Sequence, residues 1–244
     1  MTLSAMTSCV TATRPSVTGL HVGTSGFSYP EWRGSFYPAG ARPAEFLRLY
    51  AERLSSVEIN STFYDLPSQA QVEKWRDQVP ADFAFALKMT RRITHFGAVD
   101  LAGEFCERVA TLGDRLGPVL VQLPPTRPRD EGLLQLLLGS LDPALRYAFE
   151  LRHESWAGVA PILDAAGIAL VGSLDGAAPF RYLRLREPPY DDAALEAWAV
   201  RLRPLLAEGV ELFVYVNKGE TPDHSPGGEP TAVTATRLLE LLAG

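Results

Sequence analysis

Short apolar segments alternate with helical patterns along almost the whole chain, and this alternation is typical of α/β proteins in which helices cover a parallel sheet. The predicted strands lie near residues 20–24, 56–60, 83–88, 119–123, 147–152, 168–172, 182–186 and 212–217. The predicted helices lie near residues 43–54, 68–78, 101–116, 130–141, 159–166, 192–208 and 230–242. Only the segment 173–181, after the sixth strand, is too short for a full helix.

Eight strands with helices between them predict a single TIM-type (β/α)8 barrel, with an incomplete helix between strands 6 and 7. An open doubly wound sheet is the alternative. The turn Gly23-Thr-Ser-Gly26 has too few glycines for a dinucleotide-binding motif. We therefore expect a barrel domain over residues 19–244, preceded by a flexible N-terminal tail over residues 1–18.

Composition narrows the class of protein further. The chain has 244 residues, of which 46% are hydrophobic, and a net charge of −6. The negative total argues against a protein that coats nucleic acid. Cys9 and Cys106 are too few for a disulfide framework or a thiolate metal cluster. With no signal peptide recognised at the N-terminus and no apolar run of about 18 residues, we expect a cytoplasmic protein without a membrane partner. The oligomeric state stays open.

The alternation of side chains within each strand predicts where polar groups gather. The stretch 57–64 alternates apolar and polar residues, so Glu58 and Asn60 should point the same way. Large residues should meet the helices and small ones the crowded barrel axis. That rule turns inward a polar set at the carboxyl ends of the strands: Glu58, Asn60, Lys88, Gln122, Glu150, Arg152, Arg184, Arg186 and Asn217.

Barrel enzymes carry their chemistry at this end of the strands. The set holds four cations and two carboxylates, a charge of +2 in a negative chain, which favours an anionic ligand. Glu58 or Glu150 is the expected general base, and Lys88 is an electrostatic clamp or, less favoured, an amine nucleophile. The arginines suit forked recognition of phosphate or carboxylate. The alternative is an internal salt-bridge network with only a structural role.

Histidines and aromatic residues complete the candidate site. His21, His95, His153 and His224 have no spacing of a known metal motif, so we expect no metal and no cofactor. His95 and His153 are expected to contact substrate or to hydrogen-bond within loops. Six aromatic residues on loops would stack on a ligand ring or pack within the loops: Trp32, Phe36, Tyr37, Phe63, Tyr64 and Trp156.

Several blocks of sequence resemble the YecE-like family, domain of unknown function 72. They are GTSGFSYPEW at 23–32, GSFYP at 34–38, EINSTFY at 58–64, FALK at 85–88 with TH at 94–95, and ELRHESW at 150–156. The resemblance extends over about residues 20–242 and implies a TIM-type barrel without an established reaction. It places the following residues at recurring family positions: Trp32, Asn60, Tyr64, Lys88, His95, Glu150, Arg152 and Trp156.

The resemblance weakens toward the carboxyl end of the chain. Arg184-Leu-Arg-Glu187 stands where the family has Arg-Leu-His-Gly, and Asn217-Lys218 where it has Asn-Asn. Replacing that histidine by Arg186 removes a group that titrates near neutral pH.

Three functions are compatible with these observations. The leading hypothesis is an enzyme that acts on a phosphorylated or carboxylate small molecule, with a glutamate base and stabilisation by lysine and arginine. The second is a barrel that binds nucleic acid or cleaves phosphodiesters. The third is an anion-binding module without catalysis. The sequence does not decide whether the protein is an enzyme.

Overall fold

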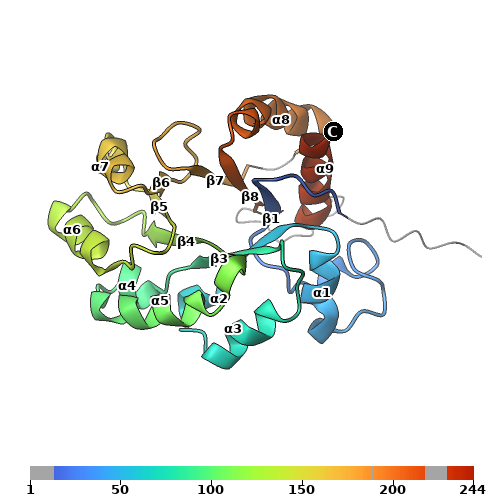
Figure 1. The fold of residues 1–244 in the computed structure, drawn as a ribbon, viewed down its shortest axis with the longest axis horizontal. Helices are drawn as coiled ribbons and strands as arrows, with labels where there is room; N and C mark the ends of the chain where they lie inside the picture. The colour runs from blue at the N-terminus through green and yellow to red at the C-terminus, as the bar shows by residue number, and fades with distance from the viewer. Residues whose placement is uncertain (1–13, 188–189, 218–229) are drawn as a thin grey trace, which may run out of the picture.

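The computed structural model describes residues 14–187, 190–217 and 230–244. In this part of the chain, parallel strands alternate with helices (Figure 1). The strands are β1 (Leu20–Thr24), β2 (Ser56–Ile59), β3 (Ala84–Lys88), β4 (Leu116–Leu123), β5 (Tyr147–Leu151), β6 (Ala169–Leu170), β7 (Phe180–Leu185) and β8 (Glu211–Val216). The α-helices are α1 (Phe46–Ala51), α2 (Ser61–Tyr64), α3 (Gln69–Arg76), α4 (Arg91–Thr94), α5 (Ala102–Ala110), α6 (Glu131–Ser140), α7 (Ala160–Ala165), α8 (Asp192–Ala207) and α9 (Thr231–Ala243). Single 3-10 turns cover Pro30–Trp32, Pro43–Glu45, Val99–Leu101, Gly113–Arg115 and Glu154–Trp156.

Side-chain caps explain where several helices begin. Ser68 accepts a hydrogen bond from the Gln71 amide at the start of α3, and Asp130 accepts one from the Leu133 amide at the start of α6. Asp191 caps α8 in the same way through the Ala194 amide. Each cap satisfies one of the amide groups that a helix leaves unpaired in its first turn.

The strands pair into two parallel sheets. Within the described residues, one sheet has the order β1-β8-β7 and the other β2-β3-β4-β5-β6. At one junction the Gly26 amide donates to the Glu58 carbonyl over 2.9 Å, and at the other the Gly172 amide donates to the Tyr182 carbonyl over 2.9 Å. The predicted α/β class with parallel strands is confirmed, whereas the strand pairing does not show one closed barrel sheet.

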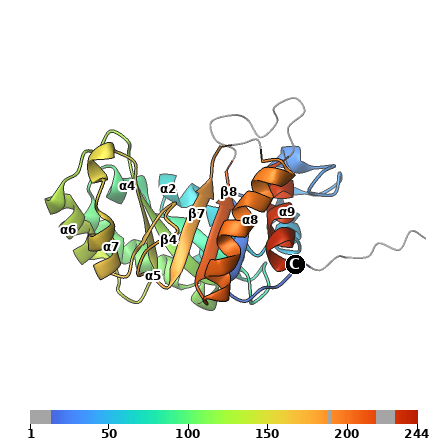
Figure 2. The ribbon, with the colours of Figure 1, turned by 90° about the horizontal axis from the view of Figure 1, so that it is seen from above.

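Two apolar clusters hold the sheets and helices together. The larger one lies between the helices and the outward sides of the strands, and helices surround the strands in Figure 1. Figure 2 shows α8 and α9 together on the side of β8. The smaller cluster joins the two sheets and consists of Ala84, Ala86, Leu120, Ala148, Ala169, Ala178, Phe180, Tyr182, Phe213 and Tyr215. The predicted phase of β3 and β5 is confirmed, since their alanines lie in this cluster and Phe85, Leu87 and Phe149 in the other.

Several predicted boundaries are wrong. β2 ends at Ile59, and residues 61–64 of the alternating stretch form α2 instead of extended chain. The helix expected over residues 101–116 ends at Ala110, and β4 begins at Leu116 rather than near residue 119. β6 has only two residues. The segment between β6 and β7 is too short for a full helix, as expected, and the incomplete helix predicted there is also absent, since residues 173–179 form only bends and coil.

The described part of the expected tail contacts the fold. The Arg14 guanidinium donates to the Leu54 carbonyl over 2.7 Å, and its side chain is 7% exposed. Val17 packs against the larger apolar cluster. Residues 1–13, as well as Lys218 and His224, lie outside the described residues. Among the helices that are described, none has the length and hydropathy needed to cross a membrane.

Gly23 lies where β1 meets β2 and leaves no room for a side chain. A Cβ atom at this position would lie 1.9 Å from the Ser56 carbonyl oxygen and 2.6 Å from its carbonyl carbon. Because both neighbours belong to the backbone of β2, neither can rotate away. Glycine at this position therefore allows the close contact between the edges of the two sheets.

We predict that Gly23→Ala lowers the free energy of unfolding by about 1–3 kcal/mol or more, because the two strands must separate to admit the methyl group. Urea denaturation measures this loss. Gly139→Ala is the matched control, because Gly139 lies in α6 and a Cβ atom added there would meet nothing within 4 Å beyond its chain neighbours and the nearby backbone of its own helix. This variant should stabilise the protein by about 0.5–1 kcal/mol. Equal stability of wild type and Gly23→Ala would contradict the close contact.

Candidate functional site

Arg184 on β7 connects two carboxylates from the other sheet. Its Nη2 donates to Glu58 Oε1 on β2 over 2.8 Å, and its Nη1 donates to Glu150 Oε2 on β5 over 2.8 Å. The Arg184 side chain is only 5% exposed. One buried guanidinium therefore links the carboxyl ends of three strands that belong to two sheets.

Glu58 is fully buried and accepts hydrogen bonds at both oxygens. Besides Arg184, Oε1 accepts from Ser25 Oγ over 2.7 Å and from Asn60 Nδ2 over 3.2 Å, while Oε2 accepts from Tyr182 Oη over 2.7 Å. Burial raises the pKa of Glu58, but the charge of Arg184 and these hydrogen bonds together lower it further than burial raises it. Its pKa therefore lies below the ordinary value, and Glu58 is ionised at neutral pH.

Glu150 also pairs with the other two arginines of the cluster, Arg152 and Arg186. Its Oε1 pairs with Arg186 and accepts from Arg152 Nε over 3.3 Å. Gln122, the register partner of Glu150 on β4, accepts from Arg152 and Arg184 over 3.4 Å each. The side chains of Arg152 and Arg186 are 34% and 28% exposed, so the cluster reaches from buried Arg184 toward solvent.

Lys88 differs from the arginines of the cluster because it pairs with no carboxylate of the described residues. Its Nζ lies 3.9 Å from the centroid of the Phe63 ring, a cation–π contact. No carboxylate of the described residues lies within ion-pair distance of it. Burial and the charge of Arg184 lower the pKa of Lys88 to about 8, against the opposing influence of Glu58 and Glu150.

A cavity of about 220 Å³ lies beside Lys88. Its lining combines two cations, two amides, one serine and three aromatic residues, and consists of Ser25, Tyr29, Asn60, Phe63, Tyr64, Lys88, Arg184 and Asn217. The Nε of Arg184 is buried and has no hydrogen-bond acceptor among the described residues. Asn217 Nδ2 donates to Ser25 Oγ over 3.2 Å, which fixes one wall of the cavity.

Three predicted ligand contacts lie away from this cavity. Trp32 has no exposed surface and packs against Tyr29, Phe36 and Tyr37. Trp156 is 3% exposed and donates from Nε1 to the Arg127 carbonyl over 3.1 Å. The Nδ1 of His153 accepts from the Ser155 amide and caps the turn Glu154–Trp156. The structure places these side chains in local packing and capping roles.

His95 does not line the cavity but packs against Phe63, which does. Its ring meets the Phe63 ring edge-on at 5.0 Å between centroids, and its Nδ1 lies 2.9 Å from Thr94 Oγ1. Burial and the charge of Lys88 lower its pKa. Over the described ranges, no three side chains of histidine, cysteine, aspartate or glutamate are placed to hold a metal ion.

Sequence reasoning missed Ser25, Tyr29 and Tyr182 as parts of the site. Tyr182 shares the inward phase of Arg184, two residues away, so the strand pattern contained a signal for it. Ser25 directly follows β1, so the rule that barrel sites lie just after the strands could have predicted it as well. The contact between Phe63 and Lys88 had no such signal, because it depends on how α2 turns.

Comparison with known proteins identifies the family. The family model for "Protein of unknown function DUF72" matches residues 21–242, so the chain belongs to that family. The UPF0759 protein YecE of Escherichia coli K12 is 34% identical over 142 residues, which are 56% of this chain. The match spans about half the length of that curated relative, 50%.

Solved structures of the same family have the same fold. A DUF72 family protein from Enterococcus faecalis V583 superposes with a TM-score of 0.76 at 19% identity, covering 91% of this chain and 95% of that one. A DUF72 family protein from Thermotoga maritima MSB8 gives a TM-score of 0.73 at 23% identity, covering 92% and 99%. At these identities the similarity establishes the fold.

We predict that Arg184→Met lowers the free energy of unfolding by about 3–5 kcal/mol, because Glu58 and Glu150 lose the cation that both share in a buried position. Arg152→Met is the matched control: its side chain is one third exposed, so its loss should cost less than about 1 kcal/mol. Urea denaturation of both variants gives the comparison. Equal losses would show that Arg184 is not the electrostatic centre of the fold.

Glu58 should also determine part of the stability at acid pH. Because its pKa is lower in the folded protein, its stabilising effect is complete above the unfolded carboxyl pKa of about 4.3 and is lost as the pH falls through the folded value. We expect the unfolding free energy of wild type to fall below about pH 4.3, and Glu58→Gln, though less stable at neutral pH, to show a shallower acid slope. Parallel acid slopes would contradict the depressed pKa.

Proposed function

We propose that the two sheets form a TIM-type barrel and that its carboxyl-end mouth binds a small anionic molecule, on which the protein acts as an enzyme. Three observations support the barrel: helices on all sides of the strands (Figure 1), an apolar cluster shared by both sheets, and a backbone hydrogen bond at each junction between them. Sites of barrel enzymes lie at this end of the strands.

The position of Lys88 is the observation that carries the proposal. Lys88 and Arg184 line one cavity, and Lys88 has no carboxylate partner among the described residues to neutralise it. A half-buried cation beside two amide groups favours a phosphate or a carboxylate as its partner. The two glutamates already share Arg184, so the cluster as a whole keeps a charge of +2 for a ligand.

The proposed roles follow from the exposure and the pairing of each group. Lys88 clamps the anion and, with a pKa of about 8, can donate a proton to a developing oxyanion at neutral pH. Arg152 and Arg186 reach the solvent side and guide the anion inward. Asn60 and Asn217 orient it. Glu58 accepts from four donors and has a depressed pKa, so we assign it the role of positioning Arg184 rather than that of the base.

Binding without catalysis is the second candidate function. It is favoured by one observation: both carboxylates of the cluster are paired with arginine, so neither has an open position for proton abstraction. A ligand that binds through Lys88 but is recovered unchanged after prolonged incubation would assign the protein to this class. Conversion of the ligand would assign it to the enzymes.

We predict that inorganic phosphate raises the melting temperature of wild type, and that Lys88→Ala abolishes this effect because the cavity loses its unpaired cation. At about a hundred times the dissociation constant, the ligand should add about 2.7 kcal/mol of apparent stability. Lys74→Ala, an exposed lysine on α3, is the matched control and should respond as wild type does. A phosphate response that is the same in Lys88→Ala as in wild type would contradict the proposed site.

A further inference from the structure

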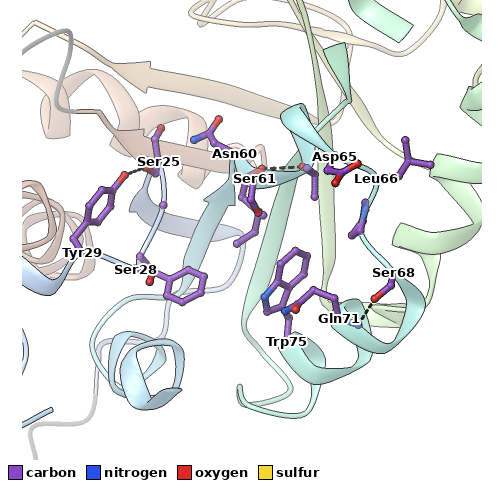
Figure 3. A pocket seen from close by; sticks show the side chains of 15 residues that line it. Ser25, Ser28, Tyr29, Asn60, Ser61, Asp65, Leu66, Ser68, Gln71 and Trp75 are labelled. Atoms are coloured by element: carbon purple, nitrogen blue, oxygen red, sulfur yellow. Dashed lines mark hydrogen bonds between the residues drawn. The ribbon is translucent and has the colours of Figure 1, made fainter. Parts of the chain in front are cut away.

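A second cavity, of about 620 Å³, adjoins the small one (Figure 3). Ser25, Tyr29 and Asn60 line both cavities, so the two share a wall. Sites for small molecules usually enclose about 300–1,000 Å³. The cavity at Lys88 is smaller than this range and suits an anionic group alone, whereas the second cavity has room for the rest of a ligand.

The lining of the second cavity differs in charge from that of the first. None of its lining residues is a lysine or an arginine, and its charged member is Asp65. Figure 3 shows the Ser25–Tyr29 segment on one side, Ser68 and Gln71 of the α3 region on the other, and the Trp75 ring between them. Of the two cavities, only the small one therefore offers an anionic group cationic partners.

Unused hydrogen-bonding groups surround the second cavity. The side chains of Ser28, Ser61 and Gln71 line it and have no hydrogen-bond partner within the described part of the chain. Trp75 is 8% exposed and provides an aromatic surface between them. Hydroxyl and amide groups around an aromatic surface suit an uncharged ring that carries hydroxyl groups of its own.

We propose that the ligand is an anionic group attached to an uncharged, hydroxyl-bearing ring, with the anion at Lys88 and the ring in the cavity between Ser28 and Gln71. Asn60 lies at the junction and contacts both parts. This inference rests on the proposed function, because it assigns the anion to the same site. A sugar phosphate and a nucleoside monophosphate share this chemistry.

The test is titration calorimetry with inorganic phosphate, a hexose phosphate and a nucleoside monophosphate. Wild type should bind at least one of the ring phosphates about tenfold or more tightly than inorganic phosphate, a gain of about 1.4 kcal/mol. Gln71→Trp, which fills the cavity from an exposed position, should lose this gain and keep its affinity for inorganic phosphate. Gln69→Trp, on the same helix but outside the cavity lining, is the matched control and should keep the gain.

The outcomes separate this inference from the function on which it rests. Equal affinity of wild type for all three probes, or equal effects of the two tryptophan variants, overturns the ring site and leaves the anion site in place. Phosphate binding that is absent, or that Lys88→Ala does not weaken, overturns both. Tighter binding of the hexose phosphate than of inorganic phosphate would show that a sugar ring is sufficient to occupy the second cavity. Tighter binding of the nucleoside monophosphate alone would show that the site also needs the base.

Discussion

The buried bridge from Glu58 through Arg184 to Glu150 is the interaction on which the rest of the site depends. Burial of three ions is costly unless each one is fully hydrogen-bonded. Glu58 meets this condition through Ser25, Asn60 and Tyr182 in addition to Arg184. These contacts come from β1, β2 and β7 or the residues that follow them, so satisfying one carboxylate fixes the carboxyl ends of strands in both sheets. The same bonds set the walls of the cavity at Lys88.

The charge that remains after this pairing gives the site its chemical character. Arg184 serves both carboxylates, while Arg152 and Arg186 add further positive charge at the side of Glu150. Lys88 is left with an aromatic ring as its neighbour and a pKa lowered to about 8 by burial and Arg184. An anion in the cavity would relieve the repulsion between these cations. The site is therefore locally positive and suited to an anion, although the chain as a whole has a charge of −6.

The strand alternation predicted much of this arrangement. It placed Glu58, Lys88 and Arg184 on the inward side because side chains alternate strictly with a period of two residues. It failed where tertiary contacts decide the structure. Apart from Ser61, the alternation of the second strand continues in the sequence to Phe63. The structure nevertheless forms α2 over Ser61–Tyr64, where Thr62 Oγ1 donates to the Lys88 carbonyl over 2.7 Å. The burial of Trp32 and Trp156 likewise depends on neighbours that are distant in sequence.

The most direct test of the anion site is the titration of Lys88 by NMR in the presence and absence of phosphate. The chain has three lysines, Lys74, Lys88 and Lys218, so selective labelling gives few signals, and Lys88→Arg assigns the one that matters. We expect Lys88 to titrate near pH 8 without phosphate and at a higher pH with it, because a bound anion favours the charged amine. Titration near the ordinary value of 10.5, unchanged by phosphate, would show that Lys88 is not the unpaired cation of an anion site.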